Sequence, residues 1–470
     1  MAGHAQSVVA DPNSASRAMA IVHELLREYH PRDFAVELWD GTRLDPEPGQ
    51  FCRFTWRINH AGALRALFSS AKQVALGEAY VYNEFDICGD ILAVFRLAEH
   101  LAEKTWSAKE KLRLAGWLLG LPSVHRAAAK AARLRGERHS RTRDRRAVSF
   151  HYDVSNDFYK LWLDQAMVYS CAYFKSAEDS LEAAQEQKLA YICRKLRLRP
   201  GDRLLDIGCG WGGLILHAAR KYGVHATGIT LSQQQFEGAQ KRIEDVGLSS
   251  RCDVRLLDYR DAEQLGEFDK LASVGMVEHV GEGNLPEYFQ AAFRLLKPGG
   301  VFLNHGIGRA ASRRNSKEPT FSDVYVFPDS ELIPISDTLS CAERAGFEVR
   351  DVENLREHYV LTLCQWLRRL EDNAEPARRL VGQLKYRIWR LYLAGSAYYF
   401  QSGKLDVYQS LLVKSCDGRS GMPMTRDDWY RSEESAPVLQ ARPEVGQTAE
   451  LRSAADEDGN LLLQRIGIVR

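Results

Sequence analysis

This chain of 470 residues has no long apolar run and almost no net charge. None of its apolar runs reaches the ~20 residues that a membrane-spanning helix needs, and the first twenty residues contain no apolar segment typical of a secretory signal. Lys and Arg together number 63, against 62 Asp and Glu, so no global field attracts nucleic acid or a membrane. We therefore expect neither an integral membrane protein nor a secreted one, and any charged partner must be recruited by a local patch.

Cysteines with metal-binding or redox spacing are also missing. The nine cysteines, which include Cys52, Cys171, Cys209 and Cys364, are scattered without C-x-x-C spacing, and their number is odd. This pattern argues against a disulfide framework and a zinc site, and it favours a reducing compartment. We expect a cytoplasmic protein without a metal.

The most informative stretch is Leu204–Gly213, which reads LLDIGCGWGG. An apolar run closed by an acid and then by alternating glycines is typical of a buried strand that turns into a helix beneath a ligand. Gly208 and Gly210 begin a G-x-G-x-x-G spacing, which alone is a weak dinucleotide signal. Asp206 precedes these glycines, and a carboxylate at this loop suits a cationic ligand better than a diphosphate. The stretch favours S-adenosylmethionine (SAM), with a nucleotide site or a purely structural turn as alternatives.

Strands and helices alternate after this loop. Further strands are expected at residues 224–229, 252–257, 268–274 and 301–303, with helical segments between them. Such alternation predicts an α/β fold, in which helices cover both faces of a parallel sheet. Ligands of these sheets bind at the carboxyl ends of the strands, where the Gly208 loop lies.

Composition divides the chain into four parts. Residues 1–105 are expected to form a small α+β domain, in which Asp40-Gly41 predicts a hairpin. Residues 106–149 read as a basic helical linker, residues 150–414 as the catalytic domain and residues 415–470 as a polar tail.

The basic linker allows two interpretations. It is either a solvated helix or a surface for anionic phospholipid headgroups, each basic residue near a membrane contributing about 1 kcal/mol. A nucleic-acid arm is a third possibility, but no recognisable reading motif lies beside it. The basic residues are Arg126, Lys130, Arg133, Arg135, Arg138, Arg141, Arg143, Arg145 and Arg146.

Polar and aromatic side chains follow the second and third strands. Gln235 lies on the first turn after the second strand, where its amide offers hydrogen bonds to ribose hydroxyls. The triplet Asp258-Tyr259-Arg260 comes just past the third strand. Its acid and its aromatic ring could hold an adenine, and a surface turn is the alternative.

Four more side chains with different functional groups are expected near the same edge of the predicted sheet. Glu278 and His305 follow apolar strands, Cys171 lies between the aromatic residues Tyr169 and Tyr173, and Tyr359 lies in the stretch REHYVLTL. Each has an ordinary structural explanation: a helix cap, a lone structural histidine, a buried inert thiol and an unremarkable tyrosine. Together they would surround one cofactor pocket, without metal-ligand spacing among them.

With these residues assembled, the chain resembles the cyclopropane-fatty-acid synthase family, which includes the mycolic acid cyclopropane synthases. The resemblance runs from about His151 to Lys414 and rests on motifs that occur in the family's order: HYDVSNDFY, YSCAYF, LLDIGCGWGG, GITLSQQQ, MVEHVG, LLKPGG and HYVLTL. It implies a class I SAM-dependent methyltransferase fold (Rossmann-like) that transfers a methyl group from SAM to a cis double bond of an acyl chain.

The resemblance also implies roles for individual residues. Together with Asp206, the residues expected to line the SAM site are Tyr169, Ser170, Gly208, Gly210, Thr230, Leu231, Gln235, Tyr259 and Arg260. The groups expected to hold a bicarbonate ion, which would serve as the base, are Cys171, Glu278, His305, the backbone of Ile307, and Tyr359. Methyl transfer to an alkene leaves a carbocation, and the faces of Tyr398 and Tyr399 are expected to stabilise it.

Two comparisons with the family bear on the substrate and the chemistry. Ser396 stands where some bacterial members carry a cysteine, so no cysteine nucleophile is available there. The first 145 residues resemble, more weakly than the core, the extra N-terminal domain of phospholipid-acting members. This favours unsaturated phospholipid acyl chains as substrate and a peripheral membrane location. The sequence does not fix the oligomeric state, and a homodimer is one of the open alternatives.

Alternatives remain open at this point. Cyclopropane, methyl-branched and methylene products share one carbocation, so the sequence does not separate them. A small-molecule N-methyltransferase and a non-catalytic lipid-binding protein are further readings. A nucleic-acid methyltransferase would explain the arginines, but the sequence has no N/D-P-P-Y tetrad to hold a flipped base, and no nucleic-acid partner is expected.

Overall fold

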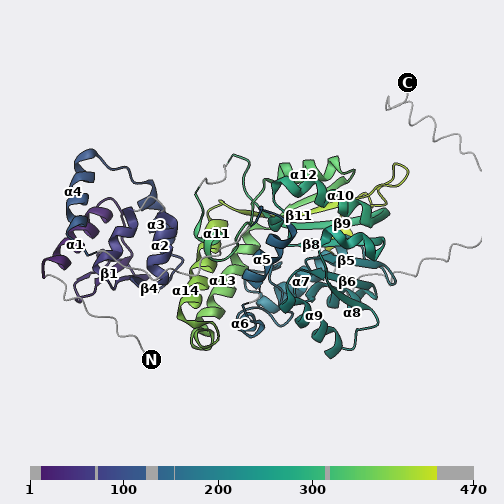
Figure 1. Cartoon of the computed structure of the whole chain (residues 1–470), viewed down its shortest axis with the longest axis horizontal. Coiled ribbons are helices and arrows are strands. Elements are labelled where there is room, and N and C mark those ends of the chain that lie inside the picture. Colours follow the sequence, from purple (N-terminus) through teal and green to yellow (C-terminus); the bar gives the residue numbers. More distant parts are fainter. Residues whose placement is uncertain (1–11, 69–71, 123–135, 153, 313–317, 431–470) are drawn as a thin grey trace, which may run out of the picture. The chain divides into compact units, whose positions relative to one another are not determined.

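The computed structural model describes residues 12–68, 72–122, 136–152, 154–312 and 318–430. Figure 1 shows their helices and strands in chain order. Arg126, Lys130, Arg133 and Arg135 of the predicted linker lie outside the described residues, as does the predicted tail beyond Tyr430.

The first part of the chain forms the predicted α+β domain. Its sheet has the order β2-β1-β3-β4, and Asp40-Gly41 forms the turn between β1 and β2, as predicted, with Gly41 at a φ of +87°. The strands are β1 (Phe34–Leu38), β2 (Arg43–Leu44), β3 (Phe54–Ile58) and β4 (Phe85–Gly89), and the helices are α1 (Pro12–Leu26), α2 (Lys72–Val81) and α3 (Val94–Glu103).

Helix α4 (Ala108–Leu119) packs with this domain rather than forming part of a separate linker. Leu114 on its inner face is buried. Glu110 pairs with Arg27 at 2.5 Å and Arg113 pairs with Glu24 at 2.6 Å, both partners being on or next to α1. The domain therefore extends past the predicted boundary at residue 105.

The catalytic domain contains a sheet of seven strands in the order β10-β11-β9-β8-β5-β6-β7. All strands run parallel except β11, which is antiparallel to both of its neighbours. The predicted strands are all present, and the sequence reasoning missed β10 and β11. The strands are β5 (Arg203–Ile207), β6 (His225–Thr230), β7 (Cys252–Leu256), β8 (Phe268–Val274), β9 (Leu296–Gly308), β10 (Glu348–Asn354) and β11 (Asp406–Val413).

Helices cover both faces of this sheet, as the alternating pattern predicted (Figure 1). Leu204 packs in a core with residues of α7, α8 and α9, whereas Leu205, the next residue, packs in a second core with residues of α10 and α12. Successive strand residues thus point to opposite faces, as pleating requires. These helices are α7 (Leu181–Leu196), α8 (Gly213–Tyr222), α9 (Gln233–Asp245), α10 (Leu285–Leu295) and α12 (Ile335–Arg344).

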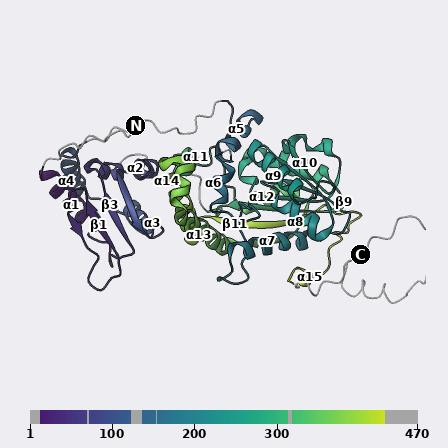
Figure 2. The same ribbon diagram turned by 90° about the horizontal axis from the view of Figure 1, so that it is seen from below.

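Further helices form an aromatic-rich cover beside the sheet. In Figures 1 and 2, α13 (Arg356–Asp372) and α14 (Ala374–Gln401) lie beside each other and next to α6 (Asn156–Lys160). Two buried arginines of α14 bind the N-terminal domain: Arg387 donates to Tyr80 O at 2.8 Å and Arg390 donates to Ile87 O at 3.1 Å. Of the described helices, none is long and apolar enough to cross a bilayer.

Two predicted boundaries differ from the observed elements. Helix α5 (Arg141–Tyr152) crosses the boundary at residues 149 and 150, because it is tied to the catalytic domain by ion pairs from Arg141 to Asp261 and from Arg143 to Asp329. The first part of the predicted tail is ordered by contact with α7, since Trp429 is buried and its carbonyl accepts from Arg194 Nε at 2.9 Å.

Candidate active site

The glycine loop connects β5 to α8, as its sequence predicted. Gly208 and Gly210 adopt φ angles of +82° and +55°, a region that other residues rarely enter. The amides of Gly208 and Cys209 donate to Ile229 O on β6, at 2.9 and 3.0 Å. The loop is therefore fixed against the end of the neighbouring strand.

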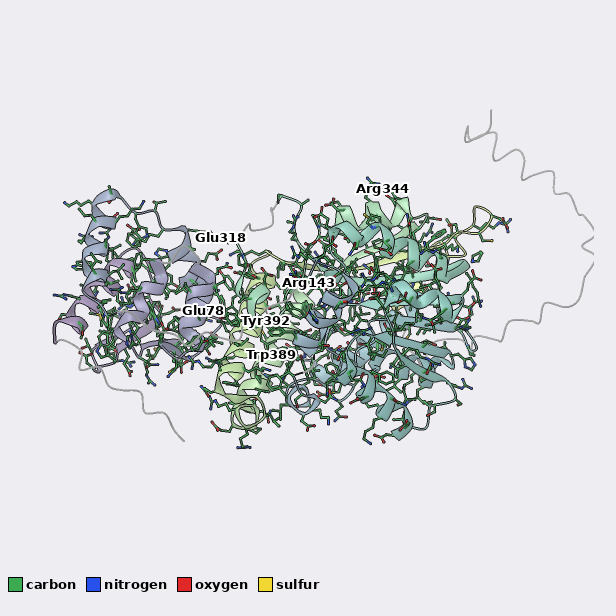
Figure 3. All side chains as sticks on the ribbon, viewed as in Figure 1. Glu78, Arg143, Glu318, Arg344, Trp389 and Tyr392 are labelled. Atoms are coloured by element: carbon green, nitrogen blue, oxygen red, sulfur yellow. The ribbon has the colours of Figure 1, made fainter. Side chains whose placement is uncertain are left out.

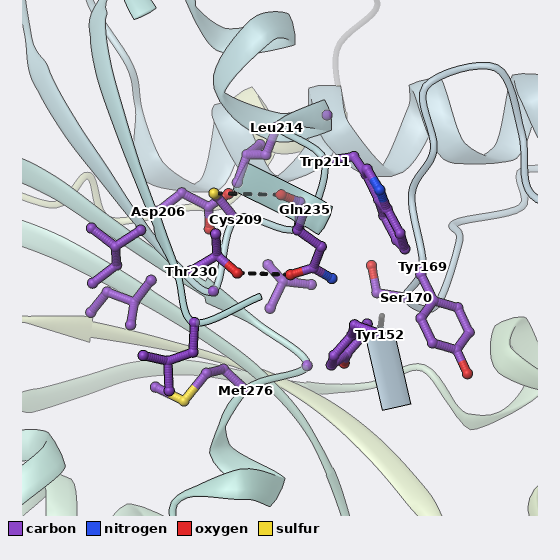
Figure 4. A pocket seen from close by; sticks show the side chains of 18 of the residues that line it. Tyr152, Tyr169, Ser170, Asp206, Cys209, Trp211, Leu214, Thr230, Gln235 and Met276 are labelled. Atoms are coloured by element: carbon purple, nitrogen blue, oxygen red, sulfur yellow. Dashed lines mark hydrogen bonds between the residues drawn. The ribbon is translucent and has the colours of Figure 1, made fainter. Parts of the chain in front are cut away.

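This loop forms one side of a cavity with about 1090 Å³ of atom-free space, part of which opens to solvent. Figure 4 shows side chains from several elements converging on it. Every residue that the sequence suggested for the cofactor lines this cavity: Tyr169, Ser170, Asp206, Gly208, Gly210, Thr230, Leu231, Gln235, Tyr259 and Arg260. Residues far apart in the chain meet here because the strands end at one edge of the sheet.

Asp206 supplies a buried carboxylate to this cavity. Burial raises the pKa of Asp206 to about 7, while the charge of Lys188 lowers it. Asp206 Oδ1 has no hydrogen-bond partner among the described residues, and a buried acceptor left unpaired is costly. The cavity wall therefore fits a ligand that brings a positive charge or a hydrogen-bond donor.

The orientation of Gln235 is fixed by its neighbour. Thr230 Oγ1 donates to Gln235 Oε1 at 2.8 Å, so the amide NH₂ group is the end left to face the cavity (Figure 4). This group donates hydrogen bonds. It can therefore bind the oxygen atoms of ribose hydroxyls, as the sequence reasoning suggested.

The residues Asp258, Tyr259 and Arg260, which follow β7, only partly have the positions that the sequence predicted. Arg260 Nε donates to Asp258 Oδ1 at 2.8 Å, and Arg260 Nη2 donates to both Asp258 Oδ2 and Asp144 Oδ2, at 2.7 and 2.9 Å. The carboxylate of Asp258 is thus engaged by Arg260 and does not line the cavity. Tyr259 lines it, and its ring packs edge-on against Tyr288.

A second group of buried polar atoms lies at the ends of β8 and β9. Glu278 Oε1 accepts from the Ile307 amide at 2.7 Å, and Glu278 Oε2 has no partner within the described part of the chain. His305 Nδ1 contacts Gln409 at 3.2 Å, and its Nε2 likewise has no described partner. Burial raises the pKa of Glu278 to about 7 and lowers that of His305 to about 3, where the charges of Lys188 and Lys195 also contribute.

Tyr359 links Cys171 to Glu278, because it interacts electrostatically with both. The pKa of Tyr359 is raised well above its usual value by burial and by nearby groups that include Cys171 and Glu278. Burial also raises the pKa of Cys171, whose thiol contacts the carbonyls of Ala172 and Leu355 at 3.3 and 3.7 Å. Leu355 precedes the first turn of α13, which carries Tyr359. Burial favours the neutral thiol, which can donate to either of these carbonyls.

The backbone of Ile307 reaches this group only through Glu278. Its amide is the donor that holds Glu278 Oε1, so it orients a carboxylate. Glu278, His305, Cys171 and Tyr359 lie outside the lining of the large cavity. Lys188 connects the two regions, because it lines the cavity and interacts electrostatically with both Asp206 and Cys171.

Lys188 is a residue of the site that the sequence reasoning missed. It is fully buried in α7, and Lys188 Nζ donates to Ser170 Oγ at 2.8 Å. Burial lowers its pKa to about 8. The signal in the sequence was its place beside apolar Leu189 in a helix whose apolar face must pack inward.

The aromatic residues expected to stabilise the carbocation are not at the site. Tyr398 donates to Glu99, and Tyr399 accepts from Gln73 at 3.1 Å, so both phenols contact the N-terminal domain. The prediction for these two residues was wrong. They lie on the part of α14 that contacts the N-terminal domain, and other aromatic residues of this helix contact the site.

Two other aromatic residues of α14, Trp389 and Tyr392, contact residues of the site; Figure 3 labels both. Tyr392 interacts with Tyr169, Ser396 and Glu278. Trp389 packs at 5.1 Å from the ring of His151 and 6.2 Å from that of Tyr169. Among the described residues, no three His, Cys, Asp or Glu side chains converge as ligands for a metal.

Comparison with known proteins places this site in a family. Residues 139–410 match the family model described as mycolic acid cyclopropane synthetase. The chain belongs to the mycolic acid cyclopropane synthetase family. Residues 21–110 match a separate domain of unknown function.

The similar proteins are named as lipid-modifying enzymes. A probable fatty acid methyltransferase of Pseudomonas putida is 41% identical over 403 residues, which are 84% of this chain and 96% of the relative. The cyclopropane-fatty-acyl-phospholipid synthase of Escherichia coli is 39% identical over 268 residues, which are 57% of this chain and 67% of the relative.

Solved structures agree with the fold. A mycolic acid cyclopropane synthase crystallised with SAH and CTAB is 34% identical, with a TM-score of 0.54, over 57% of this chain and 97% of that one. The cyclopropane synthase MmaA2 of Mycobacterium tuberculosis is 32% identical, with the same TM-score and coverage. The catalytic domain is a class I SAM-dependent methyltransferase of this family.

Proposed function

We propose that the protein transfers a methyl group from SAM to the cis double bond of an unsaturated phospholipid acyl chain and closes a cyclopropane ring with the help of bound bicarbonate. The observation that carries the proposal is the pair of unpartnered buried atoms Glu278 Oε2 and His305 Nε2, close to a cavity whose wall holds a buried Asp206. The cavity at Asp206 suits a cationic methyl donor, and the region of Glu278 and His305 suits an anion.

The cavity residues fit SAM. Asp206 would pair with a positively charged part of the ligand, which would relieve its unpaired oxygen. Gln235 would donate to the ribose hydroxyls, and the ring of Tyr259 would pack against the adenine. SAM would supply an electrophilic methyl group on a sulfonium.

The second group of residues fits bicarbonate. His305 Nε2 and the Tyr359 hydroxyl can donate to the oxygen atoms of the ion, and Glu278 Oε2 can accept from its hydroxyl group. These hydrogen bonds are needed because a buried ion without partners is very unfavourable. Bicarbonate would supply a base for the proton that the added methyl group loses.

The chain's own residues would control the fate of the carbocation. Water would trap such a cation as an alcohol, so the site must be dry. Trp389 is buried near the site, and Tyr169 and Tyr392 are partly buried there. Such π faces stabilise a desolvated cation by about 2 kcal/mol. Removal of a proton from the added methyl group closes the ring.

A methyl-branched product is the second candidate. It is supported by the names of two relatives, the probable fatty acid methyltransferase of Pseudomonas putida and the tuberculostearic acid methyltransferase of Mycobacterium tuberculosis. The base site favours the cyclopropane, because a branched, saturated chain results when the carbocation is reduced and not deprotonated.

The products can be separated by mass spectrometry of lipids from cells with and without the protein. We expect monounsaturated chains to gain about 14 mass units, the mass of one CH₂ group, and to lose the double bond. A gain of about 16 mass units would instead support methyl transfer with reduction. Unchanged lipids would contradict both products and reopen the small-molecule N-methyltransferase.

We also propose that the protein is cytoplasmic and binds the membrane surface through α4. Leu112 and Leu119 are 78% and 81% exposed, and with exposed Ala108 and Ala115 they follow helical spacing along one stripe. Exposed Lys109 and Lys111 lie beside the stripe. An apolar stripe flanked by lysines suits the headgroup region of an anionic bilayer.

Three described arginines of the basic linker pair with acids of the catalytic domain, while Arg145 and Arg146 are exposed. Arg141 pairs with Asp261 at 2.7 Å, Arg143 with Asp329 at 2.6 Å and Arg138 with Glu331 at 2.9 Å. Their role is therefore to hold α5 and the preceding turn against the catalytic domain. The proposal for membrane binding accordingly rests on α4.

Sedimentation with vesicles tests this surface. Leu112→Ser combined with Leu119→Ser should reduce binding to vesicles of phosphatidylglycerol and phosphatidylethanolamine at least tenfold. Leu380→Ser is the matched control, since Leu380 is an exposed leucine of α14, and it should bind as the unmodified protein does. Equal binding by the double variant would contradict the proposed surface.

A further inference from the structure

Gln409 lies directly opposite His305 in the central sheet. The two residues form a register pair between β11 and β9, and both are buried, Gln409 completely. The Gln409 side-chain amide contacts His305 Nδ1 at 3.2 Å. The second nitrogen, Nε2, is the one without a described partner. In a neutral imidazole, the protonation of Nδ1 therefore decides whether Nε2 donates or accepts a hydrogen bond.

Lys195 fixes the orientation of the Gln409 amide. Its Nζ, which is buried completely, lies 3.0 Å from Gln409 Oε1 and 2.5 Å from Glu353 Oε2, with Asp351 Oδ2 at 3.5 Å. A lysine ammonium donates hydrogen bonds and accepts none. The atom of Gln409 that faces Lys195 must therefore be the oxygen, and the atom that faces His305 must be the NH₂ group.

The same logic fixes the tautomer of His305. A Gln409 NH₂ group that donates to Nδ1 requires Nδ1 to be unprotonated, so the proton of the neutral imidazole resides on Nε2. The imidazole stays neutral because burial, together with the charges of Lys188 and Lys195, lowers the pKa of His305 to about 3. His305 consequently presents a buried N–H donor.

We propose that Gln409 and Lys195 are positioning residues, which hold His305 in the Nε2–H tautomer so that it donates a hydrogen bond to the anionic base. The chain of contacts runs from Glu353 through Lys195 and Gln409 to His305. These four residues lie on β10, α7, β11 and β9, so they come together only in the folded protein. The identity of the anion as bicarbonate rests on the proposed function, but the tautomer does not.

A purely structural role is the competing explanation. Lys195 could serve only to neutralise Glu353 and Asp351 and so tie α7 to the edge of the sheet. That role predicts that changes at Gln409 alter stability while leaving the proton of His305 where it was. The position of this proton is therefore the deciding observation.

Nuclear magnetic resonance of protein labelled with ¹⁵N-histidine locates the proton. The His305 signals are identified by their loss in His305→Asn, and an unprotonated ring nitrogen is clearly distinct from a protonated one. In the unmodified protein we expect a proton on Nε2 and none on Nδ1. In Gln409→Glu a carboxylate faces Nδ1, and we expect Nδ1 to become protonated.

Steady-state kinetics provide the second readout. Gln409→Met keeps the length of the side chain and removes its hydrogen bonds, so His305 loses its preference for one tautomer. We expect the KM for bicarbonate, measured with added bicarbonate in CO₂-depleted buffer, to rise about tenfold, while the KM for SAM is unchanged. Ser410→Ala is the control, because Ser410 is the adjacent buried residue and points to the other face of β11.

The outcomes separate this inference from the proposed function. A proton on Nδ1 in the unmodified protein, or an unprotonated Nδ1 in Gln409→Glu, overturns the positioning role. The expected tautomers combined with a reaction that ignores bicarbonate would support the positioning role and remove bicarbonate from the proposed function. Should Gln409→Met fail to fold, the spectra of the unmodified protein and Gln409→Glu still decide the question.

Discussion

Glu278 and Ile307 are joined by a hydrogen bond of 2.7 Å from the Ile307 amide to Glu278 Oε1. This bond turns the second carboxylate oxygen, Oε2, to a buried position without a described partner. A side chain held by one oxygen and free at the other is suited to accept a proton or a hydrogen bond from a reacting group. Glu278 lies in the short 3₁₀ helix that follows β8, and β8 pairs with β9, which carries His305.

Glu278→Gln tests this role directly. The amide keeps the shape of the side chain and cannot accept a proton, so we expect kcat to fall at least 100-fold, the usual lower range for a lost acid or base. SAM affinity, measured by calorimetry, should change less than threefold, since Glu278 is outside the lining of the large cavity. Full activity of this variant would exclude Glu278 from the chemistry.

The same substitution should stabilise the protein at high pH. Burial raises the pKa of Glu278 from 4.5 to about 7, so the folded state disfavours the ionised form. Stability from this group is full below pH 4.5 and is lost as pH rises through 7, a loss of about 3 kcal/mol in total. We expect Glu278→Gln to gain about 2 kcal/mol more over the unmodified protein at pH 8.5 than at pH 5.5.

Urea unfolding of both proteins at the two pH values measures this difference. Because both proteins share all other titrating groups, the comparison isolates residue 278. A gain in unfolding free energy that is equal at both pH values would mean that Glu278 titrates normally in the folded protein.

Asp206→Asn should weaken SAM binding while it stabilises the free protein. Asp206 is buried and its Oδ1 is unpaired among the described residues, so removing its charge eliminates a desolvation cost. The lost charge interaction with the ligand should raise the Kd for SAM about tenfold or more. Calorimetry and thermal unfolding check the two effects, and unchanged affinity would remove Asp206 from the cofactor site.

Tyr392→Leu should change the products rather than the cofactor affinity. Tyr392 is partly buried and interacts with Tyr169 and Glu278. Its loss should admit water and produce some methylated, hydroxylated chains from trapping of the carbocation. Tyr399→Phe is the control, because Tyr399 contacts Gln73 of the N-terminal domain. Product profiles from mass spectrometry that are identical for both variants would contradict this role.

The ten residues predicted for the cofactor all line the large cavity, but many of its other lining residues were not predicted. The predicted residues follow strands whose carboxyl ends meet at one edge, so local motifs were enough to bring Gly208, Thr230 and Tyr259 together. The pairing of Asp258 with Arg260 was missed, because a neighbouring arginine in the sequence gives no sign of whether it folds back on the acid.

Contacts between distant elements could not be predicted in this way. Lys188 and Lys195 lie seven residues apart on α7, and lysines in a helix usually face solvent, yet both are buried completely. Their partners Ser170 and Gln409 come from other elements. Trp389 and Tyr392 were missed for a similar reason, since the rotation of α14 about its axis depends on what packs against it.

The central claim is that a buried base removes a proton from the methyl group that SAM delivers. Methyl-deuterated SAM, given to the purified protein with vesicles of monounsaturated phospholipid and bicarbonate, tests it most directly. The claim predicts a product that has lost the double bond and retains two of the three deuterium atoms, at a rate that depends on bicarbonate. A product that retains all three deuterium atoms, at a rate independent of bicarbonate, would contradict it.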